Sequence, residues 1–580
     1  MSIRQMLVAN PTIRQSERVR STPLALGARA LLVGILLTGF GLRLVLLNRF
    51  AFHQDEAIYS VWALHGWRVD PLFLTVWPDK PPIYLWLLGW TFDLFGATPA
   101  AARFLNIACS TLTIAVVAAL ARFWWGARTA LFAALWMALN PFAISFAPTA
   151  FTDPLLVLAG MLALLAAVRR RLFWAGVWLG IALMTKQQGV LFVPLVLAFS
   201  PDAPYARGKL LRGAGALLAG GLLVVAPVMF WDSLRWAVAP SPWDLGARNA
   251  AGFAFSAPAT WLSRLQDWAV QGSYLLGNGL LWALALGAGI ALVLVQTTHP
   301  RQCALRKSPV IKLALWGLTF LALHVITTVQ IWDRYLLPLA PVVALLLAFT
   351  TERALTQSLT QRRRDAEKAQ RNTLQTLVYF SSATLRASAS LRQRHILQWA
   401  PVALAGLLLL MAPGPAIQAA QGRLPIGGDH GAYMGLSKVA AWLQVHADAT
   451  PVIYHRNLGW HFRFELFTPV QEGRVDLRWY PSSVYLADNA AKTPHRPRYL
   501  VVADWSPERD LAINLALRRL TMQERLRAGR FTVYEISERA QPPAAWRVCR
   551  MPAAARCTPA WRALAETALP AAACVAAGGP

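Results

Sequence analysis

Long apolar runs, separated by short polar and basic segments, occupy about two-thirds of the chain. A helix needs roughly 20 apolar residues to cross a bilayer core of about 30 Å. The pattern therefore predicts an all-α polytopic membrane protein with about eleven transmembrane helices. The predicted spans are residues 24–47, 104–121, 129–147, 154–168, 172–184, 189–199, 213–231, 273–296, 310–331, 335–350 and 396–416.

The basic residues lie between these runs and predict a topology, because Lys and Arg are enriched in cytoplasmic loops. The N-terminus is basic, so residues 1–23 are expected in the cytoplasm and the first span is expected to end outside. This span is too long for a signal-peptide core and is predicted to be uncleaved. The same rule predicts residues 48–80 outside and the basic segment 351–395 inside.

One apolar segment does not fit this alternation. "PPIYLWLLGWTFDLFG" (81–96) is short, begins with two prolines and contains Asp93. If it crossed the membrane, every later basic cluster would lie on the outer side. We therefore predict an interfacial or re-entrant helix on the outer face.

The pattern changes after residue 420. "GLSKVAAWLQVHA" has helical periodicity, whereas "TPVIYHR", "VDLRWY", "RYLVVAD" and "FTVYEI" have the composition of short strands. These segments predict a small extracytoplasmic α/β domain. The predicted organisation is a cytoplasmic N-terminus (1–23), a transmembrane module (24–350), a basic linker (351–395), a last transmembrane helix (396–420), the α/β domain (421–540) and an Ala/Pro-rich tail (541–580).

Composition supports a membrane protein and excludes a nucleic-acid-binding one. The chain of 580 residues is 56% hydrophobic and 14% charged, against about 25% charged in soluble domains. Its net charge of +28 comes from clusters between apolar runs, which is how topology is encoded. The five cysteines have no metal-ligand spacing, so the sequence indicates no metal site and no cofactor, although a divalent metal stays open. The three cysteines of the tail, Cys549, Cys557 and Cys574, can form disulfides or stay free thiols.

Two adjacent acids, Asp55 and Glu56, follow the first span. They can be solvated loop acids, or one of them can act as a general base toward an acceptor hydroxyl. Asp153 follows Thr152 and precedes Pro154, which suits a helix start: Thr152 can cap this helix, and Asp153 can favour its dipole. Ionisable groups beside lipid are costly to desolvate and are functional candidates.

Three cationic candidates lie in other segments predicted at the outer surface. Lys80 can be an interface lysine, or it can hold a phosphate as a point charge. Lys186 can be an interface lysine. Arg334 can be paired structurally with Asp333. Single histidines such as His324 have no partner at a metal-ligand spacing.

Five segments taken in order are more specific than any single motif. They are "DEAIY" (55–59), "DKPPIYLWLLGWTFDLFG" (79–96), "FTDPLLVL" (151–158), "LMTKQQGVLFVPLVL" (183–197) and "DRYLLPLAP" (333–341). Together they resemble the GT-C glycosyltransferases of the protein O-mannosyltransferase and aminoarabinose transferase superfamily. The resemblance covers roughly residues 30 to 350, and "DEAxY" and "KPPxxxW" are its distinctive pieces.

The resemblance implies a membrane glycosyltransferase that takes a sugar from a polyprenyl-phosphate donor on the outer face of the plasma (inner) membrane. The acceptor is a protein, lipid or glycan hydroxyl, and direct displacement inverts the anomeric centre. Asp55 is implied as the base, with Asp153 near the same pocket, and we expect a supporting catalytic role for Glu56. The lipid phosphate is implied to contact Lys80, Lys186, Arg334 and Tyr335.

At "TKQQG" (185–189) the chain departs from the superfamily, where Gly and Pro usually follow the lysine. Residues after 420 match no motif of the superfamily.

A secondary transporter is the main alternative to a glycosyltransferase, although such proteins tend to have paired repeats and midplane charges. A non-catalytic scaffold that displays the outer domain is a further one.

Overall fold

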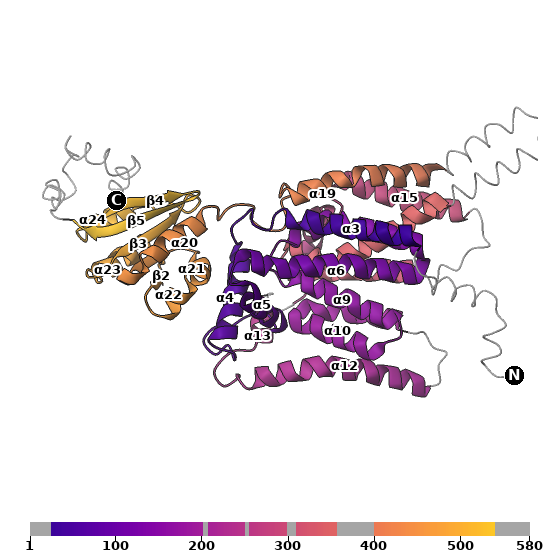
Figure 1. The fold of residues 1–580 in the computed structure, drawn as a ribbon, viewed down its shortest axis with the longest axis horizontal. Coiled ribbons are helices and arrows are strands. Elements are labelled where there is room, and N and C mark those ends of the chain that lie inside the picture. The colour runs from indigo at the N-terminus through magenta and orange to yellow at the C-terminus, as the bar shows by residue number, and fades with distance from the viewer. Residues whose placement is uncertain (1–24, 201–206, 250–253, 298–308, 357–398, 540–580) are drawn as a thin grey trace, which may run out of the picture. The chain divides into compact units, whose positions relative to one another are not determined.

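The computed structural model describes residues 25–200, 207–249, 254–297, 309–356 and 399–539 (Figure 1). They form two compact units. The larger comprises the chain up to Arg49 and residues 62–430, and the smaller comprises residues 50–61 and the chain from Gly431. Cys303, the basic segment 357–398 and the tail cysteines lie outside the described residues, so the predictions made for them stay untested.

The described part of the larger unit is mostly helical, with one isolated β-bridge between Phe255 and Thr327. Its helices are α3 (Leu26–Leu44), the end of α4 (Gln54–Arg68), α5 (Ile83–Phe95), α6 (Pro99–Trp125), α7 (Ala127–Ala138), α8 (Pro141–Phe146), α9 (Asp153–Val168), α10 (Leu172–Thr185), α11 (Phe192–Phe199), α12 (Arg207–Ser233), α13 (Pro242–Asn249), α14 (Trp261–Ser273), α15 (Gly279–Thr297), α16 (Pro309–Ile326), a helix over Leu339–Thr356 and a helix over Trp399–Ala420 that ends with α19 (Pro413–Ala420).

Every predicted span overlaps at least one of these helices. Among the described residues, six helices are long and apolar enough to cross a membrane: Leu26–Leu44, Pro99–Trp125, Leu211–Ser233, Pro309–Ile326, Leu339–Thr356 and Trp399–Ala420. The other predicted spans fall on shorter apolar helices. Helix α5 is also a short apolar helix, and its position at the interface stays a prediction. The predicted fold class, a helical membrane protein with a small C-terminal α/β domain, is confirmed.

Local sequence explains where the central helices begin and how they pack. At the start of α6 the Thr98 side chain accepts a hydrogen bond from the Ala101 amide, and Pro99 is the first helical residue. Helices α3, α6, α9, α10 and α12 lie side by side (Figure 1). Arg43 of α3 is fully buried, and its guanidinium donates to Ser110 Oγ and to the Ala138 carbonyl. The buried charge is thus hydrogen-bonded on neighbouring helices.

Two features of the larger unit differ from what the sequence pattern indicates. The pattern indicates a loop over residues 232–272, between two predicted spans, but this segment contains α13 and α14, because short polar and Trp-containing helices have neither the length nor the apolarity of a span. Thr152 does not cap α9 with its side chain: its hydroxyl is buried without a hydrogen-bond partner, and Asp153 occupies the first turn.

The smaller unit contains a five-stranded sheet of order β2-β1-β3-β5-β4. Strands β1 (Val452–His455), β2 (Asp476–Trp479) and β3 (Arg498–Ala503) are parallel. Strands β4 (Leu520–Ala528) and β5 (Phe531–Glu538) complete the sheet in antiparallel fashion. The sequence predicted four of these strands and missed β4, whose charged residues hide the alternation.

Helices cover both faces of this sheet. On one face, Val439 of α20 (Leu436–Val445) and Phe462 of α21 (Gly459–Glu465) pack on Ile453 of β1. On the other, α23 (Ser483–Ala491) and α24 (Leu511–Ala516) pack on β1, β3 and β5. Residues 50–61 also belong to this unit, although they are distant in sequence.

Candidate active site

The three predicted phosphate-binding cations all lie in the larger unit, and their charges interact. Lys186 is repelled by the charges of Arg334 and Lys80 and attracted by that of Asp153. Its ammonium also lies 4.3 Å from the centre of the Tyr335 ring. The structure therefore gathers one acid, three cations and one aromatic ring that are up to 255 residues apart in sequence (Lys80 to Tyr335).

Lys186 and Asp153 form a buried ion pair. Lys186 Nζ lies 2.5 Å from Asp153 Oδ1, and the two side chains are 6% and 1% exposed. Lys186 ends α10 in an extended conformation, and Asp153 begins α9. A carboxylate and an ammonium at such depth stabilise each other's charged form, since either alone would be costly to bury.

Lys80 also has an acidic partner. Its ammonium donates to Asp79 Oδ2 at 2.7 Å, and Asn249 Nδ2 donates to the same oxygen at 2.8 Å. Asn249 is the last residue of α13, so this helix helps to orient the Asp79 carboxylate.

The two glutamines of "TKQQG", where the sequence departs from the superfamily, join the segments that carry Lys80 and Arg334. Gln187 Nε2 donates to the Asp79 carbonyl at 2.9 Å and to the Pro242 carbonyl at 3.1 Å. Gln188 Nε2 donates to the Tyr335 carbonyl at 3.0 Å. Sequence reasoning missed this role, because the partners are 55 to 147 residues away.

Arg334 lies on a short 3-10 turn, Asp333–Leu336. Its guanidinium carbon is 4.8 Å from the centre of the Phe151 ring, next to the start of α9. Asp333 accepts two backbone hydrogen bonds, from the Arg334 amide at 2.7 Å and from the Gly427 amide at 3.1 Å. These contacts hold the turn that presents Arg334 and Tyr335.

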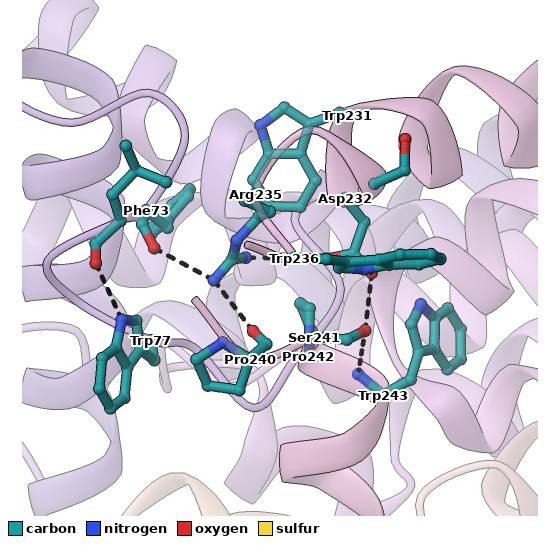
Figure 2. A network of polar contacts seen from close by, with 12 residues as sticks. Phe73, Trp77, Trp231, Asp232, Arg235, Trp236, Pro240, Ser241, Pro242 and Trp243 are labelled. Carbon is teal, nitrogen blue, oxygen red and sulfur yellow. Dashed lines mark hydrogen bonds and ion pairs between the residues drawn. The ribbon is translucent and has the colours of Figure 1, made fainter. Parts of the chain in front are cut away.

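A second network, missed from the sequence, joins the loop that carries Phe73 to the segment between α12 and α13 (Figure 2). Arg235 is fully buried and donates to the Phe73 carbonyl at 3.1 Å and to the Pro240 carbonyl at 3.2 Å. Asp232 accepts from Ser241 Oγ at 2.6 Å and lies 3.9 Å from Arg235. Because Pro240 leads into α13, this network fixes the loop that brings Asn249 to Asp79.

The predicted carboxylates Asp55 and Glu56 lie in the first turn of α4, in the smaller unit. Glu56 Oε2 accepts from the His53 amide at 2.8 Å, and His53 Nδ1 accepts from the Asp55 amide at 3.0 Å. This arrangement is a variant of the capping box, with histidine in the place of Ser or Thr, in which the cap accepts from the second helical amide, that of Asp55, rather than from the third. Glu56 is buried, whereas Asp55 is partly exposed.

Each unit holds charged groups of the kind that transfer of a group from a phosphate ester requires. Ammonium and guanidinium groups bind phosphate oxygens and stabilise charge that develops on a leaving phosphate. A partly exposed carboxylate can accept a proton from a hydroxyl. In the larger unit, the ammonium groups of Lys80 and Lys186 each lie beside an acid, Asp79 and Asp153 respectively.

Comparison with known proteins identifies the class. The family model described as dolichyl-phosphate-mannose-protein mannosyltransferase matches residues 79–231. ArnT from Cupriavidus metallidurans in the apo state is similar to the chain, with a TM-score of 0.56, 17% identity and coverage of 88% of this chain and 98% of that one. The chain has the GT-C glycosyltransferase fold. The predicted recognition is confirmed, and the family match and the fold together indicate an enzyme, a membrane glycosyltransferase.

Two further structures share the GT-C fold with this chain. ArnT bound to undecaprenyl phosphate has a TM-score of 0.54, 17% identity and coverage of 88% of this chain and 98% of that one. Archaeal oligosaccharyltransferase AglB from Archaeoglobus fulgidus, in complex with an inhibitory peptide and a dolichol-phosphate, has a TM-score of 0.50 and 13% identity, with coverage of 85% and 71%. A search of curated proteins finds no match.

Proposed function

We propose that this GT-C protein transfers a sugar from a polyprenyl-phosphate donor to an acceptor hydroxyl at the outer face of the membrane, with inversion. The observation that carries the proposal is the group formed by Lys80, Lys186 and Arg334, at the edge of apolar helices. A lipid-linked phosphate needs cations at such a position. The proposal is supported by the family match, which begins at Asp79 and includes both lysines.

The lipid-linked donor is further supported by two structures of the same fold. One is ArnT bound to undecaprenyl phosphate, and the other is AglB in complex with a dolichol-phosphate. In this chain, Arg334 offers a planar fork of donors to phosphate oxygens, and the lysines offer point charges. Tyr335 positions the Lys186 ammonium through its ring.

The proposed reaction is a direct displacement. The acceptor oxygen forms a bond to the anomeric carbon while the bond from that carbon to the phosphate oxygen breaks, and the phosphate keeps the electron pair. The acceptor proton passes to the Asp55 carboxylate. The released monoester has a second pKa near 6. We propose that it departs without a divalent ion, because the cations stabilise the developing charge.

Loss of Lys80 or Arg334 should weaken donor use. With Lys80→Ala or Arg334→Ala, we expect kcat/KM for the donor to fall by about 10- to 100-fold, as for one lost charged contact. Arg334→Lys should recover only part of the lost kcat/KM for the donor, because a point charge replaces a bidentate fork. The measurement is release of polyprenyl phosphate by the purified protein from a panel of polyprenyl-phosphate sugars, with and without EDTA.

Arg68→Ala serves as the matched control. Arg68 pairs with Asp93 at 3.0 Å, and both side chains are more than 40% exposed, so its loss should leave donor use unchanged. Wild-type donor kinetics in both Lys80→Ala and Arg334→Ala would remove these residues from the site. Counterflow of a labelled solute in proteoliposomes without sugar transfer would favour a transporter instead.

The outer location of the reaction has a separate test. In a cysteine-free background, Val445→Cys, exposed in α20, should react with an impermeant thiol reagent in intact cells. Asn372→Cys, in the basic segment, should react only after lysis, because that segment is expected in the cytoplasm. Labelling of Asn372→Cys in intact cells would overturn this topology.

A further inference from the structure

We infer that the C-terminal domain is a positioning element for the proposed base, and that His461 is the residue through which it acts. The inference rests on the proposed function, because it assigns Asp55 as the base. It concerns residues 50–61, which form one compact unit with the chain from Gly431.

The first observation is the hydrogen bond that His461 makes. His461 Nε2 lies 3.0 Å from the Phe52 carbonyl oxygen, 409 positions earlier in the chain. A carbonyl only accepts, so Nε2 carries the hydrogen and donates it. Phe52 directly precedes His53, the capping residue of α4.

The second observation is that His461 is itself held rigidly. Its ring stacks on Tyr433, with centroids 4.2 Å apart and planes at 30°. The side chain is 3% exposed, and burial lowers the pKa of His461 to about 4. The imidazole is therefore neutral at neutral pH, and the Phe52 carbonyl selects the tautomer that carries its hydrogen on Nε2.

Apolar contacts reinforce the same attachment. The rings of Phe52 and Phe464 lie 5.0 Å apart at 58°, and Phe464 follows His461 on α21. Ala51 packs against the apolar core that α20, α21 and the sheet share. Phe52 is thus held at its carbonyl and its ring, and Ala51 is held by apolar packing.

The capping box carries this constraint to the carboxylates. His53 Nδ1 accepts from the Asp55 amide, and Glu56 accepts from the His53 amide. A shift of Phe52 would move His53 and turn the first residues of α4. Since a displacement of about 1 Å can cost 10²-fold in rate, a fixed Phe52 is a requirement for a well-placed Asp55.

The test compares His461 with His455, a matched control in the same domain. His455 ends β1, is 5% exposed, and burial lowers its pKa to about 4 as well. Its aromatic neighbour is Phe462, with centroids 6.0 Å apart. Replacement of either histidine should cost similar stability, but only replacement of His461 removes a donor to the Phe52 carbonyl.

With His461→Phe, which keeps a ring against Tyr433, we expect kcat to fall at least 10-fold while the donor KM stays within about twofold. His461→Gln, whose amide nitrogen can still donate, should recover kcat to within about threefold of wild type. His455→Phe should leave both constants near wild type. Equal losses in His461→Phe and His455→Phe, or a rise in donor KM alone, would overturn the inference.

Hydrogen exchange gives a readout that does not depend on activity. In His461→Phe, the backbone amides of residues 53–57 should exchange at least 10-fold faster than in wild type, and in His455→Phe they should not. If the wild-type protein transferred no sugar, the proposed function would be wrong. Hydrogen exchange would still test whether His461 holds the segment around Phe52. Unchanged exchange at residues 53–57 in His461→Phe would refute it.

Discussion

Asp55→Asn is expected to abolish nearly all sugar transfer while the protein still folds and binds its donor. Asparagine keeps the shape and polarity of the side chain but has no basicity. General-base assistance is typically worth about 10²- to 10⁴-fold, or roughly 3 to 5 kcal/mol of the barrier. We therefore expect kcat to fall within that range in an assay of transfer to acceptor, with little change in donor KM.

Glu56→Gln is the matched control for Asp55→Asn. Glu56 Oε2 accepts the His53 amide, and a glutamine carbonyl oxygen can accept the same bond, so the start of α4 should survive. Its effect on kcat should accordingly be milder. If Asp55→Asn retained more than about a tenth of wild-type turnover, the base would have to be sought elsewhere. Asp153 would be the next candidate, although its ion pair with Lys186 competes with such a role.

The spans and the ordered motifs could be predicted from the sequence because both depend on local pattern. An apolar run such as 104–121 is read directly as a helix, and α6 extends over it. The pieces that carry Lys80, Asp153, Lys186 and Arg334 were recognised by their order along the chain. Their charges do interact in the folded larger unit.

Contacts between distant segments could not be predicted in the same way. Nothing in "TKQQG" indicates that Gln187 donates to the carbonyls of Asp79 and Pro242, because backbone carbonyls have no sequence signature. The attachment of His461 to Phe52 is hidden for the same reason. A polar helix such as α13 lacks the apolar periodicity on which a prediction could rest.

The role of Glu56 shows what a closer local reading could have found. The spacing His53-x-x-Glu56 has the form of a capping box, but histidine is an unusual member, so the pattern was not recognised. The capping geometry gives Glu56 a structural contact and leaves Asp55, at the adjacent position, as the carboxylate that points elsewhere. This division agrees with the assignment of the proton to Asp55.

Breaking the Lys186–Asp153 pair should have the largest effect on stability. Lys186→Met leaves a buried carboxylate, and Asp153→Asn leaves a buried ammonium, so each is expected to lower the free energy of unfolding by roughly 3 to 5 kcal/mol. The double variant Asp153→Asn/Lys186→Met removes both charges. It should recover most of the lost stability, because replacement of a buried pair by neutral groups is often nearly neutral. Unfolding in detergent micelles measures all three variants.

Donor kinetics of the double variant then separate a structural pair from a phosphate site. If Lys186 contacts the donor phosphate, the stable double variant should still have a donor kcat/KM reduced about 10- to 100-fold, since a charged hydrogen bond to the phosphate is missing. The exposed pair Arg68–Asp93 is the matched control, and Arg68→Met/Asp93→Asn should change neither stability nor kinetics appreciably. Recovery of both stability and donor use in the Asp153→Asn/Lys186→Met protein would make the pair purely structural. Of the three proposed cations, Lys80 and Arg334 would then be the ones that bind the donor phosphate.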